Sequence, residues 1–134
     1  GFLEPTRTKL YAAKSRVKSL GVSMLVGFTK QIRGNVVYNM SEETAKFIAS
    51  QMMMGMPVET FDEMAQSAIS ELSNMLTAHT ATNITALELD VDISTPSLTV
   101  GADFEVKVCD GQYLVVAMDL SGKLIELDIA VDQV

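Results

Sequence analysis

The chain has 134 residues and a mass of 14.5 kDa, which is the size of one domain, and its 48% hydrophobic residues are enough for a real core. This composition excludes a disordered chain. The net charge of −7 and the isoelectric point of about 4.5 argue against a nucleic-acid partner, because affinity for nucleic acid depends on Lys and Arg neutralising phosphates.

The sequence also bears on where the protein acts. No run approaches the roughly 18 to 20 apolar residues that span a bilayer, and the first residues do not show the charged n-region and apolar h-region of a secretory leader. Cys109 is the one cysteine, which excludes an intrachain disulfide and fits a reducing compartment. We therefore expect a cytoplasmic protein with no membrane partner. Because the chain opens at Gly1 without an initiator Met, we also expect the natural N-terminus to be longer.

The first strongly patterned segment predicts a β-hairpin. Residues 21–27 and 35–40 are rich in strand-forming side chains, and the polar segment 30–34 joins them.

Two helices are predicted after the hairpin. Ser41 is placed to cap the first helix, two Glu residues follow in its first turn, and Gly55 marks its end. Thr60 and Glu63 form a capping box for a longer helix that we expect to reach about residue 79. The apolar stripe expected to face the core consists of Phe61, Met64, Ala65, Ala68, Leu72, Met75 and Leu76.

The second half of the chain changes to a period of two, which is typical of strands with one buried face. The alternation covers residues 87–94, 104–108, 113–118 and 125–129, with turns predicted at 110–111 and 121–122. We therefore predict an α+β fold in which the helices pack on one face of a mainly antiparallel sheet.

The longer helix carries the most informative polar residues. At about 100° per residue, Glu71 and Asn74 lie about 60° apart around the helix axis and one turn apart along it. They stand on one flank of the apolar stripe, with Ser67 and Ala78 above and below them. Taken alone, such a pair is most often a solvated surface feature.

The sequence gives little indication of a metal-binding site. His79 has no second His or Cys at ligand spacing, and Asp90 and Asp92 alternate as acids do on any exposed strand face. We expect no bound metal.

Three segments together resemble a known family. The run Gly34-Asn-Val-Val-Tyr-Asn-Met-Ser-Glu-Glu-Thr-Ala45 precedes Ser67-x-x-x-Glu71-x-x-Asn74, and Ser94-Thr-Pro96 follows. In this order they resemble the CheX branch of the CheC-type chemotaxis phosphatases, whose signature has a Pro at almost this distance after the Asn. The first helix lacks a second Glu-x-x-Asn, so the chain resembles the single-site CheX branch. We expect one CheX-like domain over residues 1–134, without the helix that opens the family's fold.

The resemblance implies a phosphatase that acts on the aspartyl phosphate of a CheY-like response regulator. Asn74 would then position the attacking water, and Glu71 would pair with the regulator's Lys. Ser67 and Ala78 would allow close approach, and the regulator, rather than this chain, would supply Mg²⁺.

The resemblance further implies a homodimer closed by edge strands, for which residues 113–118 or 35–40 are the predicted candidates. A rival interpretation is a non-catalytic binding module of the same fold, related to flagellar switch components. A third is an unrelated α+β ligand-binding domain in which the Glu and Asn pair arises by chance.

Overall fold

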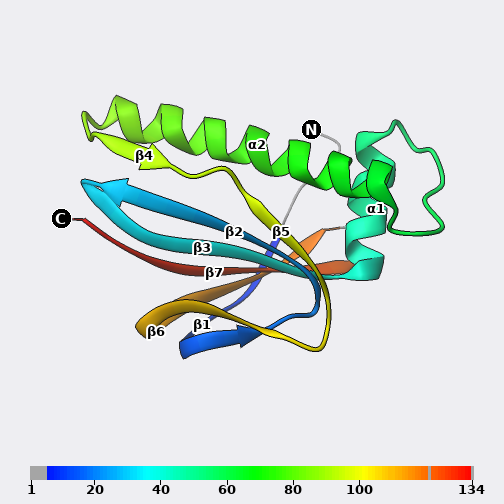
Figure 1. Cartoon of the computed structure of the whole chain (residues 1–134), viewed down its shortest axis with the longest axis horizontal. Helices are drawn as coiled ribbons and strands as arrows, with labels where there is room; N and C mark the ends of the chain where they lie inside the picture. Colours follow the sequence, from blue (N-terminus) through cyan, green and yellow to red (C-terminus); the bar gives the residue numbers. More distant parts are fainter. Residues whose placement is uncertain (1–5, 121, 134) are drawn as a thin grey trace.

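The fold is described by a computed structural model that covers residues 6–120 and 122–133. Two helices lie on one side of a seven-stranded sheet (Figure 1). The elements in chain order are β1 (Thr6–Lys18), β2 (Gly21–Lys30), β3 (Ile32–Ser41), α1 (Glu42–Met52), α2 (Glu63–Ala86), β4 (Val91–Ile93), β5 (Ser97–Gly101), β6 (Glu105–Leu120) and β7 (Lys123–Gln133).

The strands follow the order β1-β6-β7-β3-β2, and β4 and β5 both pair with the far side of β2. Each of these pairings is antiparallel. The predicted fold class is therefore confirmed, as is the hairpin, which β2 and β3 form around Gln31.

Two element boundaries differ from the prediction. Helix α2 continues past His79 to Ala86, so that only Val91–Ile93 of the expected strand at 87–94 is paired. Strand β6 runs through Asp110 and Gly111 where a turn was predicted, and the pairing of β1 with β6 shifts register at this point. Opposite Ser15 the regular pairing is interrupted at residues 108–111 of β6, and the strand continues beyond them instead of ending.

Local capping decides where the helices begin. The Ser41 hydroxyl accepts a hydrogen bond of 3.1 Å from the Thr44 amide, as predicted for the start of α1. At α2 the Asp62 carboxylate accepts from the Ala65 amide at 3.0 Å. The predicted cap at Thr60 is therefore wrong, because Asp62 reaches the free amides of the first turn.

The main core lies between the helices and the sheet. Its fully buried members include Val22 of β2, Ile48 of α1 and Ile69 of α2. The buried face of α2 includes Ala65, Ile69 and Leu72, of which Ala65 and Leu72 belong to the predicted stripe. The side chain of Leu76, also predicted to belong to it, lies outside the described part of the structure. Met64 and Met75 of that stripe are 65% and 55% exposed. The buried face of α2 is thus turned around the helix axis relative to the predicted stripe, and both of these methionines lie outside it.

A second core fills the opposite face of the sheet, where β1 and the first half of β6 fold back beneath β3 (Figure 1). The Asn35 side chain of β3 donates to the Val108 carbonyl at 2.9 Å. The Tyr113 hydroxyl donates to the Arg16 carbonyl at 3.0 Å. These bonds join strands that are far apart in the sequence and enclose an apolar cluster of Val17, Val37, Val108, Tyr113 and Val115.

Asp128 of β7 is fully buried against this second core, between Val37 and Val115 on the neighbouring strands. Neither of its carboxylate oxygens has a hydrogen-bond partner within the described part of the chain. Burial, with the nearby Glu126 carboxylate as a further cause, raises the pKa of Asp128 to about 8. Burial in the folded state therefore disfavours the charged form of this carboxyl group.

The strands proposed for a dimer edge are not edges. Residues 35–40 belong to β3, which pairs with β7 and β2, and residues 113–118 belong to β6, which pairs with β1 and β7. That part of the prediction is wrong. The alternation of apolar and polar residues shows which face of a strand is buried, but it does not show which strands pair with it. Among the described strands, β1 forms one margin of the sheet, and β4 with β5 forms the other.

Candidate functional site

Helix α2 presents the predicted polar residues to solvent. Ser67, Glu71, Asn74 and Ala78 are all exposed. The first three line a shallow, open depression of about 470 Å³ along the outer side of the helix, and Leu98 of β5 contributes to its rim. Ala78 is exposed one turn further on and does not line the depression. The structure thus gathers three of the four predicted residues into one surface.

The core fixes the orientation of this surface. Ile69 is fully buried, and Asn74 lies about 140° further around the helix axis, on the side that faces away from the sheet. A helix held by Ala65 and Ile69 in the core cannot rotate without exposing them, so the polar residues are held in place by packing.

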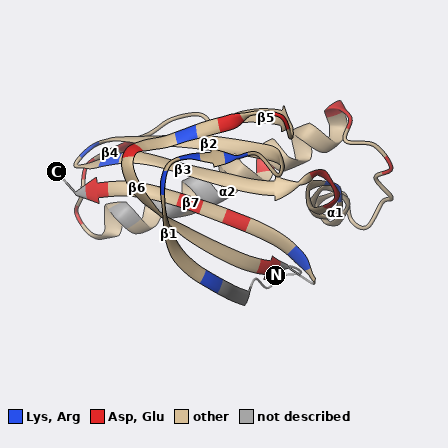
Figure 2. Cartoon of the chain, turned by 90° about the horizontal axis from the view of Figure 1, so that it is seen from below, with Lys and Arg blue, Asp and Glu red and all other residues tan. Residues whose placement is uncertain are grey.

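The site is acidic and open. Helix α2 carries Glu63 and Glu71 but no Lys or Arg, and the blue segments of Figure 2 lie on other elements. Neither Glu makes an ion pair within the described residues. The carboxylates are therefore available to a cation on a partner, and the Asn74 carboxamide can both donate to and accept from a water molecule.

The depression also includes residues that were not predicted from the sequence to belong to the site. Glu63, Gln66 and Ser70 continue it toward the start of α2. The sequence could have indicated these positions, because residues 63, 67, 70 and 74 have the spacing of one helix face and are all polar. The sequence did not indicate that Leu98 lines the depression, because its position there depends on the placement of β5.

The segment that leads into β5, the strand that carries Leu98, is hydrogen-bonded to the sheet. Pro96 directly precedes β5. Just before it, the Ser94 hydroxyl accepts from the Gly27 amide at 2.8 Å, and the Ser94 amide donates to the Gly27 carbonyl at 2.9 Å. These bonds fasten the link between β4 and β5 to β2, which places β5 beside the helix.

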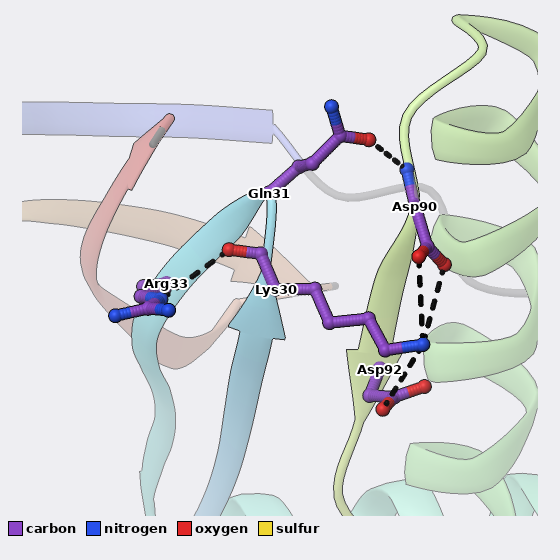
Figure 3. A network of polar contacts seen from close by, with 5 residues as sticks. All are labelled: Lys30, Gln31, Arg33, Asp90 and Asp92. Atoms are coloured by element: carbon purple, nitrogen blue, oxygen red, sulfur yellow. Dashed lines mark hydrogen bonds and ion pairs between the residues drawn. The ribbon is translucent and has the colours of Figure 1, made fainter.

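A polar network holds the segment that follows α2 against the turn between β2 and β3 (Figure 3). The Lys30 ammonium lies 3.5 Å from the Asp90 carboxylate and 3.6 Å from that of Asp92, and the Asp90 amide donates to the Gln31 side chain. Asp90, and to a lesser degree Asp92, raises the pKa of Lys30. Both acids thus have a structural partner, and they tie the segment after α2 to the turn between β2 and β3.

The described residues contain no group of three or more His, Cys, Asp or Glu side chains arranged to hold a metal ion. His79 is exposed. Within the same ranges, no helix combines the length and apolar character that crossing a bilayer requires.

Comparison with solved structures defines the class of fold. The chemotaxis protein CheX from Desulfovibrio desulfuricans superposes with a TM-score of 0.82 at 17% identity, covering 97% of this chain and 87% of that one. In the CheX-CheY-BeF3-Mg²⁺ complex from Borrelia burgdorferi the similar chain has a TM-score of 0.73 at 27% identity, covering 90% of this chain and 84% of that one. The architecture is that of the CheC-like proteins.

The sequence comparisons identify the family. The family described as chemotaxis phosphatase CheX matches residues 22–118. The CheY-P phosphatase CheX of Thermotoga maritima is 40% identical over 83 residues, which are 62% of this chain and 54% of that protein. The match therefore spans about half the length of this curated relative. The chain belongs to the chemotaxis phosphatase CheX family, as the resemblance implied.

Proposed function

We propose that this protein hydrolyses the aspartyl phosphate of a CheY-like response regulator. The observation that carries the proposal is the outward placement of Glu71 and Asn74 on α2, in the spacing of the family signature. Family membership supports it, as does the name of the Thermotoga maritima relative, a CheY-P phosphatase.

In this proposal Asn74 positions the attacking water. In-line phosphoryl transfer depends mainly on positioning and on stabilising charge. A carboxamide can accept one hydrogen from the water and donate to another acceptor, which orients the water opposite the leaving carboxylate of the receiver. Because Asn74 is exposed on a helix held by the core, it can reach into a partner's site without rearrangement of this chain.

Glu71 pairs with the Lys of the receiver's active site. Its carboxylate has no cation in the described part of this chain, so an ion pair across the interface replaces no internal one. Such a pair sets the register of the two proteins. Ser67 and Ala78 are small and exposed on the same helix, and they allow the receiver to approach the backbone closely.

The chain needs no cofactor of its own in this scheme, and the receiver supplies Mg²⁺. This assignment is supported by the Borrelia burgdorferi structure, which is a complex that includes CheY, BeF3 and Mg²⁺. The proposal places the protein in the cytoplasm with its receiver. It also includes a homodimer, now paired through β1, because among the described strands β1 pairs with β6 alone and it bears the exposed Leu10 and Tyr11.

The test is release of inorganic phosphate from a phosphorylated CheY-type receiver in the presence of the purified protein. We expect release well above the receiver's own rate. Binding of the phosphorylated receiver without faster release would instead favour the non-catalytic module of the same fold. Absence of both binding and release would contradict the proposed function.

A further inference from the structure

The depression beside Asn74 is longer than the two-residue signature. It follows the outer side of α2 from Glu63 to Asn74, which is a rise of about 16 Å at 1.5 Å per residue. Hydroxyl and carboxamide groups of Gln66, Ser67 and Ser70 lie between the two carboxylates. The residues of this depression are called the α2 groove below.

The charges of the α2 groove are of one sign. Glu63 and Glu71 are both exposed, and neither has an ion-pair partner within the described residues. Among the residues that the structure describes, no Lys, Arg or His lines the groove. The two carboxylates are eight residues apart, about 12 Å along the axis, which exceeds the Debye length of about 8 Å at physiological salt. They therefore attract two separate cations and not one shared ion.

We propose that Glu63 is a second docking residue, which pairs with a basic side chain of the receiver outside the receiver's active site. This inference rests on the proposed function, in which Glu71 already meets the active-site Lys. The occupant of the groove is a basic surface segment of the receiver, because the groove is continuous with the proposed reaction site and carries only negative charge.

The proposed role is specificity and not chemistry. Glu63 lies three turns of helix from Asn74, too far to touch the reacting phosphoryl group. A charge at the rim of an interface mainly changes the association rate and the salt dependence of binding. Receivers that lack the matching basic residue would bind more weakly while being hydrolysed at an unchanged maximal rate.

The test uses a CheY-type receiver carrying beryllofluoride and Mg²⁺ for binding, and the phosphorylated receiver for turnover. Glu63→Gln is expected to raise the Kd about two- to fivefold and Glu63→Lys about tenfold, with kcat unchanged. The difference from the unmodified protein should shrink at about 0.5 M salt, where charges are screened.

The matched controls are Glu43→Gln and Glu43→Lys. Glu43 is also an exposed acid in the first turn of a helix, so these variants reproduce the change in net charge and in the helix N-terminus. An unchanged Kd for both Glu63 variants, or an equal change in the Glu43 variants, would overturn the docking role. A protein that binds the receiver in a Glu63-dependent manner but releases no phosphate would contradict the phosphatase while supporting the docking residue.

Discussion

Ile69 and Asn74 stand five residues apart on α2 and face opposite environments, since Ile69 is fully buried in the main core and Asn74 is exposed. The buried residue orients the helix, and the exposed residue is free to meet a partner. A substitution at an exposed position of α2 can therefore test function without a large change in the stability of the fold.

Asn74→Ala should abolish receiver dephosphorylation and leave the free energy of unfolding within about 0.5 kcal/mol of the original value, because exposed helix positions contribute little to stability. Phosphate release and denaturant unfolding measure the two effects. Asn83→Ala, an exposed Asn on the same helix, serves as the control and should keep its activity. Retention of most activity by Asn74→Ala would remove Asn74 from catalysis.

Glu71→Ala should weaken binding as well as turnover, because the carboxylate is proposed to form a charge pair that sets register. The Kd for a receiver carrying beryllofluoride and Mg²⁺ should rise, and kcat should fall. Glu43→Ala changes the net charge equally on another exposed helix surface and should alter neither. If Glu71→Ala binds and turns over the receiver normally, the assigned role is wrong.

Asp128 should make the protein less stable as pH rises. Below about pH 4 the carboxyl group is protonated in both states, whereas above that pH the unfolded state ionises and the folded state keeps the proton up to about pH 8. The free energy of unfolding should therefore fall through this window, by on the order of 1 kcal/mol per pH unit. Asp128→Asn should remove the fall and be more stable at pH 8.

Denaturant unfolding of both proteins between about pH 5 and pH 9 gives the comparison. Asp132→Asn, an exposed acid on the same strand, should keep the original profile. Parallel profiles for the original protein and Asp128→Asn would show that Asp128 has an ordinary pKa.

The proposed dimer should depend on β1. Leu10 and Tyr11 are 51% and 48% exposed on this marginal strand, so Leu10→Glu with Tyr11→Glu should give a monomer in sedimentation at micromolar concentration. Leu124→Glu, at an exposed site on the interior strand β7, should leave the dimer intact. A monomeric original protein would refute the dimer.

Local chemistry in the sequence was sufficient for several features. Ser41 caps α1 because a hydroxyl at that position reaches the amide three residues later, and the β2–β3 hairpin follows from two apolar runs around a short polar turn. The spacing of Glu71 and Asn74 placed both on one side of a helix, because helical geometry relates residues only a few positions apart.

Features that depend on distant residues were decided only by the tertiary structure. Which methionines of α2 face solvent depends on the sheet beneath the helix, and whether β3 or β6 is an edge depends on strands that are distant in the sequence. The alternation around Asp128 indicated a strand, but only the folding back of β1 and β6 removed that carboxyl group from water. Periodicity reports which face of an element is buried, whereas its neighbours are set by long-range packing.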